Sequence, residues 1–205
     1  MFISFEGIDF CGKSTQIELL KNYLIEKGKQ VIVIREPGGT EISEKIRDIL
    51  LDKKHSKMFM ETEFLLFSSS RAQLVREKIQ PSLEKGIYVI SDRFHDSSTA
   101  YQGYGRGIPV EIIENIHKLA IGNTLPDITF FIDIPVAVMQ QRKQKKEKEH
   151  LDRIENSDND FYNRVRNGYL KLAEKENRFR TLNGENSIDE IHKNILKELE
   201  QLEQR

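Results

Sequence analysis

The segment that most constrains this chain is Gly7–Ser14, which reads Gly-Ile-Asp-Phe-Cys-Gly-Lys-Ser. It follows the apolar run Phe2–Phe5 and leads into a helical pattern. The spacing GxxxxGK(S/T) between a strand and a helix is typical of a phosphate-binding loop. Its glycines let backbone amides turn toward phosphate oxygens, and the helix N-terminus adds partial positive charge. The chain is therefore expected to bind ATP or GTP.

Three side chains of this loop have expected tasks. Lys13 is expected to reach the β- and γ-phosphates as a catalytic group, and Ser14 to place its hydroxyl on Mg²⁺. Asp9 would be repelled by phosphates, so it is expected to point away, toward a sugar hydroxyl or the metal. The residues expected to contact the nucleotide are Gly7, Ile8, Asp9, Phe10, Cys11, Gly12, Lys13, Ser14 and Thr15.

Length and composition restrict the class of protein. The 205 residues contain no Ser/Pro-rich linker, which predicts a single domain over residues 1–205. The formal charge of −1 combines dense charges of both signs, so no nucleic-acid partner is expected. The single cysteine suits a reducing compartment, and neither a leader peptide nor an apolar run of ~20 residues is evident. A cytoplasmic protein without a membrane partner is expected.

Short apolar runs alternate with helical patterns along the chain. The runs 2–5, 31–34, 87–90, 128–132 and 179–182 predict strands, and helices are expected over about 41–51, 59–83 and 109–121, around 161–172, and after Ser187. This alternation predicts an α/β fold with a five-stranded parallel sheet flanked by helices on both faces. Residues 91–108 are expected to be a polar stretch, with a flexible loop around Gly103–Gly107. Functional residues should follow the carboxyl ends of the strands.

Asp92 and Arg93 directly follow the third apolar run. An acid at this position resembles the Walker B carboxylate that holds Mg²⁺ together with the loop hydroxyl of Ser14. The neighbouring guanidinium could bind a phosphate with two hydrogen bonds. The alternative is an exposed salt bridge that ends the strand.

Phe67 and Arg71 stand one helical turn apart on the same face. A flat ring beside a guanidinium suits a heterocyclic base, because one stacks and the other donates hydrogen bonds. The run 97–102 adds hydroxyls, a phenol and an amide. Taken alone, such a phenylalanine is more often part of a core, and such a run is an ordinary polar helix entry.

A highly charged segment covers residues 142–157. It could be a solvated helix face, which is the usual meaning of such a run. It could also be a lid that closes over ATP and brings Arg153 to the transferred phosphoryl group. The sequence leaves both interpretations open.

In order, these motifs resemble those of bacterial thymidylate kinases along nearly the whole chain. The resemblance is carried by the loop from Phe5 to Gln16, the Glu-Pro-Gly-Gly-Thr loop of 36–40, Phe67 with Arg71, and the segments 92–94, 97–103, 126–127 and 152–155. The Glu-Pro-Gly-Gly-Thr loop combined with Ser-Ser-x-Ala-Tyr-Gln is specific. The resemblance implies a P-loop kinase with a mobile lid over about 142–157, which transfers the γ-phosphoryl group of ATP to dTMP with Mg²⁺. It also implies a homodimer, and the apolar helix around 59–79 is a candidate interface.

The resemblance also implies roles for individual residues. Phe67 would stack on thymine, while Arg71, Ser98 and Gln102 would read its edge. Tyr101 would lie under the deoxyribose and Asp9 would take the 3′-hydroxyl or approach the metal. The implied substrate set is completed by Glu36, Pro37, Arg47 and Arg93, with both arginines on the monophosphate, and Arg153 would bind the ATP phosphates.

Phe10 departs from the family pattern, in which a glycine or a basic residue usually stands at this position. Because a phenylalanine cannot donate to phosphate, the catalytic arginine is expected from the lid, and Arg153→Ala is predicted to keep nucleotide binding but lose at least two orders of magnitude in turnover. Two alternatives remain open. The chain could phosphorylate another pyrimidine monophosphate, or it could be a non-catalytic nucleotide-binding module.

Overall fold

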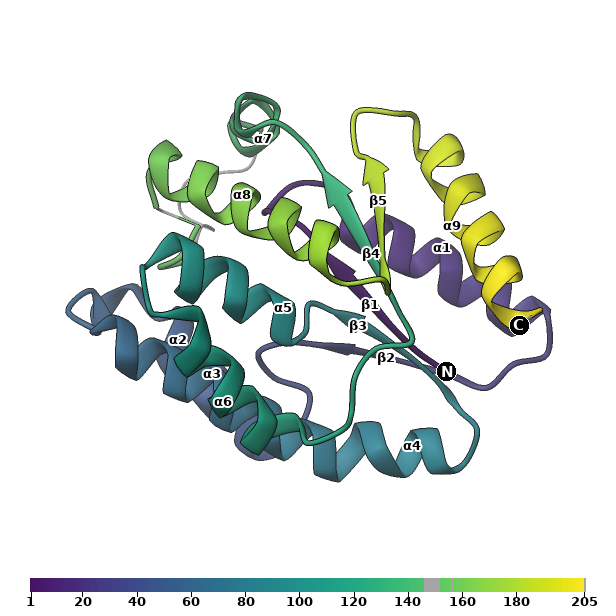
Figure 1. Ribbon diagram of the computed structural model, residues 1–205, viewed down its shortest axis with the longest axis horizontal. Helices are drawn as coiled ribbons and strands as arrows, with labels where there is room; N and C mark the ends of the chain where they lie inside the picture. Colours follow the sequence, from purple (N-terminus) through teal and green to yellow (C-terminus); the bar gives the residue numbers. More distant parts are fainter. Residues whose placement is uncertain (146–151, 156, 205) are drawn as a thin grey trace.

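A computed structural model describes residues 1–145, 152–155 and 157–204 (Figure 1). Its strands form one parallel sheet in the order β2-β3-β1-β4-β5. This confirms the predicted five-stranded parallel sheet. The strands are β1 (Phe2–Glu6), β2 (Val31–Arg35), β3 (Tyr88–Asp92), β4 (Ile128–Asp133) and β5 (Phe179–Asn183).

The register of the central strands positions the site. β1 lies between β3 and β4, and Phe5 is paired with Asp92 on one side and Phe130 on the other. The three strands are almost entirely buried, as expected for a sheet covered on both faces. Because β1 and β3 end side by side, the loop after β1 and the residues after β3 meet at one edge.

Helices cover both faces of this sheet. The first helix, α1 (Lys13–Glu26), and the last, α9 (Ile188–Glu203), pack against each other on one face, and α8 (Asn159–Lys175) lies on the other (Figure 1). The side chain of Ser187 accepts a hydrogen bond from the backbone of Glu190, which confirms the predicted start of the last helix. The remaining α-helices are α2 (Glu41–Leu51), α3 (Met60–Leu74), α4 (Gln80–Glu84), α5 (His95–Ser98), α6 (Val110–Ile121) and α7 (Val136–Lys143).

The predicted helix over 59–83 is helical throughout but not uniform. A wide π-helical turn, η2 (Val75–Ile79), separates α3 from α4. Pro81 stands at the start of α4. Because proline has no N–H to donate, it interrupts the regular hydrogen-bond ladder of an α-helix at this point.

Most of the expected polar stretch 91–108 is helical, and the flexible loop expected around Gly103–Gly107 is wrong for its first part. α5 continues into a second π-helical segment, η3 (Thr99–Gly105), which packs along α8. A Cβ atom on Gly105 would lie 2.7 Å from the Phe161 ring, and one on Gly168 would lie 2.6 Å from the Tyr104 ring. These glycines allow close packing of two helical segments, so Gly103 and Gly105 do not form the expected flexible loop.

The predicted lid lies partly outside the described residues, since 146–151 and 156 are not described. The expected mobility of 142–157 therefore stays a prediction. Its described part includes a turn at 152–155, where the backbone N–H of Arg153 donates to the carbonyl of Leu51 at the end of α2. Among the described residues, no helix is long and apolar enough to cross a membrane.

Candidate active site

The loop between β1 and α1 has the strained backbone expected of a phosphate cradle. Gly7 and Gly12 have positive φ angles of 140° and 104°, and a Cβ on Gly7 would lie 2.5 Å from the carbonyl oxygen of Ile132. Only glycine fits so close to β4. Phe10 also has a positive φ, 62°, although it carries a side chain. The loop therefore follows the path that the glycine spacing predicts.

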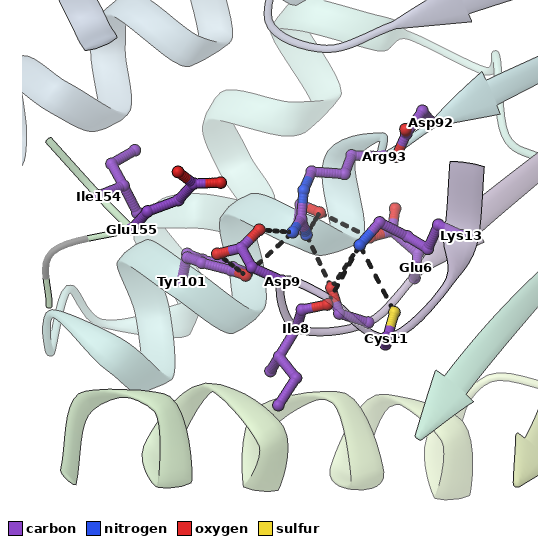
Figure 2. A network of polar contacts seen from close by, with 12 residues as sticks. Glu6, Ile8, Asp9, Cys11, Lys13, Asp92, Arg93, Tyr101, Ile154 and Glu155 are labelled. Carbon is purple, nitrogen blue, oxygen red and sulfur yellow. Dashed lines mark hydrogen bonds and ion pairs between the residues drawn. The ribbon is translucent and has the colours of Figure 1, made fainter. Parts of the chain in front are cut away.

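Lys13 lies at the first turn of α1 with its ammonium group folded over the loop. Its Nζ donates to the carbonyl oxygens of Gly7 and Ile8, each at 3.2 Å, and lies 3.6 Å from Cys11 Sγ (Figure 2). The Cys11 thiol itself is buried. The lysine is thus already held beside the backbone N–H groups that would donate to phosphate oxygens.

A cleft of about 540 Å³ opens above this loop, which is a usual size for a small-molecule site. Its lining combines the loop with nearly all residues predicted to bind substrate. From the loop it includes Asp9, Phe10, Cys11, Gly12, Lys13, Ser14 and Thr15; from elsewhere it includes Glu36, Pro37, Arg47, Phe67, Arg71, Asp92, Arg93, Ser98, Tyr101 and Gln102. The fold thus brings together residues that are up to 146 positions apart, from Asp9 to Glu155.

Ser14 and Asp92 provide oxygen atoms at one end of the cleft. The Ser14 hydroxyl donates to Asp92 Oδ2 over 3.3 Å, which links the first turn of α1 to the end of β3. Hard oxygen donors that leave most of a coordination sphere to water and phosphate suit Mg²⁺. The donor set therefore fits the predicted metal.

Arg93 is the centre of a dense polar network at the floor of the cleft (Figure 2). Its φ angle is 70°, and its guanidinium donates to Asp9 at 2.6 Å, to the Tyr101 hydroxyl at 3.0 Å and to the carbonyl of Gly7 at 2.9 Å. Burial works against its charge, but Tyr101 and Asp9 keep the pKa of the guanidinium well above its usual value. Arg93 is therefore a fixed, permanent positive charge beside the loop.

Asp9 points away from the loop amides, as predicted. Besides Arg93, its carboxylate accepts hydrogen bonds from the hydroxyls of Tyr101 at 3.3 Å and Tyr162 at 2.9 Å. Burial alone would raise the pKa of Asp9, yet the charges of Arg93 and Lys13 bring it below its usual value. Asp9 is thus an ionised acceptor held by Arg93 and two tyrosine hydroxyls.

Glu6 supports Arg93 from beneath. Its buried carboxylate accepts from the backbone N–H of Phe94 at 2.7 Å and from the Ser97 hydroxyl at 2.6 Å. Burial, reinforced by the nearby Asp96 carboxylate, raises the pKa of Glu6 to about 7. The bond to the residue immediately after Arg93 stabilises the unusual backbone that aims the guanidinium.

A second buried cluster lines another part of the cleft. Arg71, which is almost fully buried, pairs with Glu36 at 2.7 Å and donates to Ser98 Oγ at 3.1 Å. Burial raises the pKa of Glu36 despite this pairing. Phe67 lies one turn before Arg71 on α3 and also faces the cleft. Nearby, Arg47 donates to the carbonyl of Pro37 at 2.7 Å. The predicted base-reading pair therefore shares one cavity with the phosphate loop.

Arg153 does not lie where the lid interpretation expected it. Its Nη2 forms an ion pair with Glu63 at 2.6 Å and its Nε donates to the carbonyl of Leu50 at 2.9 Å, so the side chain is turned toward α2 and α3. It is absent from the lining of the cleft. The buried Glu63 carboxylate therefore holds Arg153 away from the cleft in this structure, and its contact with the ATP phosphates stays a prediction.

Arg142, at the end of α7, is the arginine that contacts the phosphate loop in this structure. Its guanidinium donates to the carbonyls of Phe10 at 3.2 Å, Cys11 at 3.3 Å and Gly184 at 2.8 Å, and it lines the cleft. Sequence reasoning included it in the charged segment without giving it a role. Tyr162 and Glu63 were also given no role, because only the packing of α8 and α3 brings these side chains to the site.

Known proteins match the chain over nearly its full length. A family model described as thymidylate kinase matches residues 5–195. The chain belongs to the thymidylate kinase family. A thymidylate kinase of Kosmotoga olearia is 48% identical over 199 residues, covering 97% of this chain and 94% of that protein. One from Fervidobacterium nodosum is 48% identical over 197 residues, covering 96% and 97%.

A solved thymidylate kinase has the same fold. The crystal structure from Ehrlichia chaffeensis gives a TM-score of 0.78 at 37% identity, covering 97% of this chain and 98% of that one. These matches confirm the resemblance and the P-loop kinase fold. Thymidylate kinases are ATP-dependent nucleoside monophosphate kinases, so the predicted enzyme class is also confirmed.

Proposed function

We propose that this chain transfers the γ-phosphoryl group of ATP to dTMP, giving dTDP and ADP. The observation that carries the proposal is the buried Arg71–Glu36 pair beside Phe67, in the same cleft as the phosphate loop. Arg71 has N–H groups left after donating to Glu36, Ser98 and the carbonyl of Phe94. A guanidinium with spare donors next to a ring suits a base with an exocyclic oxygen, as in thymine.

The phosphate loop would hold ATP, with Mg²⁺ between Ser14 and Asp92. When bound, the metal would neutralise charge on the β- and γ-phosphates. Lys13 would move from the loop carbonyls to phosphate oxygens, a short change because its Nζ already lies over the loop. Its charge would then stabilise the transferred group in the transition state.

Arg93 and Arg47 would bind the monophosphate of the acceptor. Arg93 is held by Asp9, Tyr101 and Gly7, so it would offer a preorganised charge. The acceptor oxygen is already ionised at neutral pH, which removes the need for a strong general base. Asp9 would accept a hydrogen bond from the sugar 3′-hydroxyl, with Tyr101 placed against the ring.

The arginine nearest the γ-phosphate site would be Arg142. It lies on the carbonyls of Phe10 and Cys11, directly beside the loop. Phe10 cannot donate to phosphate, so a cation from α7 would supply the charge that the loop lacks. Arg153 would act there only after leaving Glu63.

We also propose a homodimer formed through α2, α3 and α6. Large apolar side chains are exposed on these adjacent helices and beside them, with Phe59 and Leu119 each 77% exposed. An apolar hollow of about 260 Å³ between α3 and α6 lies on the same face. Exposed apolar side chains beside an apolar hollow are typical of a protein interface. A cytoplasmic location stays a prediction from the composition.

The test is ADP release with ATP and Mg²⁺ over dTMP, dUMP, UMP, CMP and AMP, with a control lacking acceptor. We expect dTMP to give by far the highest kcat/KM. Faster ADP release with another pyrimidine monophosphate would support kinase activity but reject thymine as the base that the cleft recognises. Release that no acceptor stimulates would favour the non-catalytic module, for which Phe10 in the loop is the supporting observation.

A further inference from the structure

The side-chain amide of Gln102 uses its nitrogen in a hydrogen bond, while its oxygen accepts none from the described residues. Its Nε2 donates to Glu63 Oε1 at 2.9 Å, and both side chains are buried. Within the part of the chain that the structure describes, no group donates to its Oε1. Gln102 also lines the cleft that contains Arg71 and Phe67. The amide therefore presents an unpaired acceptor on the wall where a base would bind.

We infer that Glu63 is a positioning residue that fixes the amide of Gln102 with its oxygen toward the base, so that the pocket selects a pyrimidine that carries a proton on N3. This inference rests on the proposed function, because it concerns how the same cleft reads its base. An ionised carboxylate only accepts hydrogen bonds, so it can face the NH₂ of the amide but not its oxygen. A flipped amide would place two acceptors 2.9 Å apart.

The charge of Glu63 is secured by two arginines. Arg106 donates to Oε1 at 3.2 Å and to Oε2 at 3.4 Å, while Arg153 approaches Oε2 at 2.6 Å. Burial tends to raise the pKa of Glu63, but these guanidiniums and the amide of Gln102 bring it below its usual value. The carboxylate is thus ionised and remains an acceptor across the neutral range.

The arrangement also survives movement of Arg153. The guanidinium carbon of Arg106 lies 4.4 Å from the centroid of the Phe161 ring, which holds this arginine in place. If Arg153 left for the nucleotide, Glu63 would keep the charge of Arg106 and the amide of Gln102. The orientation of the amide therefore does not depend on the position of the lid segment.

The consequence for specificity follows from base chemistry. Thymine offers an N3–H to Gln102 Oε1 and O4 to the donors of Arg71. Cytosine offers a lone pair at N3 and an amino group at C4, so both contacts become repulsive. Sites built to hydrogen-bond one pattern reject the inverse pattern strongly, because their polar groups would be left unpaired.

The test compares dTMP with 5-methyl-dCMP, which differ only at N3 and C4. We expect Glu63→Ala to lower the ratio of kcat/KM for dTMP over 5-methyl-dCMP about tenfold, mainly through KM for dTMP, because the freed amide can turn either way. Where turnover of 5-methyl-dCMP is too slow, its inhibition constant against dTMP replaces kcat/KM. Glu63→Gln keeps the volume of the side chain and so preserves packing. Its amide can offer either a donor or an acceptor to Gln102, so the ratio of kcat/KM for dTMP over 5-methyl-dCMP should fall several-fold.

A double-mutant cycle separates positioning from general damage. Gln102→Ala should lower the ratio by itself, and adding Glu63→Ala should not lower it further. Arg106→Met, which keeps the contact between Glu63 and Gln102, should leave the ratio unchanged even if it lowers the thermal midpoint. Equal losses for both nucleotides in the Glu63 variants, or the same fall of the ratio in Arg106→Met, would overturn the inference. Wild-type protein that turns over neither nucleotide would instead refute the proposed function.

Discussion

At the scale of single residues, Glu6 has the most consequential environment. It is a fully buried carboxyl whose pKa is raised to about 7 by burial and by Asp96, and it holds the backbone after Arg93. In an unfolded chain the same group would titrate near 4.5. The folded state therefore retains this proton over a range in which the unfolded state loses it, and the protonated form is the stabilising one.

The sign of the pH dependence follows. Stability from protonated Glu6 is fully present below about 4.5 and is lost as the pH rises through about 7. Between pH 5 and pH 8, we expect the free energy of unfolding of the wild type to fall by about 1 to 3 kcal/mol relative to that of Glu6→Gln. Urea titrations at both pH values measure this. Glu18→Gln on exposed α1 is the control, and a constant difference between Glu6→Gln and wild type would show that Glu6 does not titrate in this range.

At the scale of elements, the two described ends of the charged segment have different surroundings. Arg142 at the end of α7 contacts the phosphate loop, while Arg153 in the turn at 152–155 contacts Glu63 and the end of α2. A charge beside the loop can act on the transferred group, but one paired with a buried carboxylate is already neutralised. Position in the fold, and not the density of charge in the sequence, distinguishes the two arginines.

We therefore expect Arg142→Ala to lower kcat/KM for ATP by about 10- to 100-fold, an arginine-dependent loss smaller than that of a complete arginine finger. Arg153→Ala is the matched control and should change kcat/KM for ATP less than about threefold, in contrast to the loss that the sequence alone predicted. Steady-state kinetics at saturating dTMP measure both. A near-normal Arg142→Ala with a hundredfold loss in Arg153→Ala would restore the original assignment of Arg153 to the ATP phosphates.

At the scale of the whole molecule, the proposed homodimer would form through the apolar side chains exposed on α2, α3 and α6. Leu65 on α3 is 52% exposed, and so is Ile112 on α6. A glutamate at the centre of an apolar interface would be buried without a partner, which strongly disfavours association. We expect Leu65→Glu to convert a dimer to a monomer in sedimentation velocity at micromolar concentration.

Ile25→Glu is the control for this substitution. Ile25 has a nearly equal exposure of 51% but lies on α1, away from the proposed interface. It should leave the sedimentation coefficient unchanged. A wild-type protein that sediments as a monomer, or a loss of association in both variants, would reject this face as the interface.

Local patterns in the sequence were sufficient to predict the phosphate loop, the strands and part of the site. The phosphate loop could be predicted from the spacing of Gly7, Gly12 and Lys13 between a strand and a helix. Such a loop is built from consecutive residues, so the sequence shows it directly. Alternating apolar runs predicted the five parallel strands, and the rule that sites follow strand ends pointed to Asp92 and Arg93. Apolar periodicity and turn chemistry act over a few residues, so a sequence displays them directly.

The tertiary structure alone decided contacts between distant residues. The amide orientation of Gln102 depends on Glu63, 39 positions away, and the position of Arg153 depends on the same carboxylate. The helical form of 95–105 depends on close packing against α8 at Gly105 and Gly168. Burial and competition among charged partners set these features, and both exist only once the helices have packed. The sequence by itself thus determined the phosphate loop, the sheet and many of the residues that line the cleft, while the fold decided which side chains contact one another there.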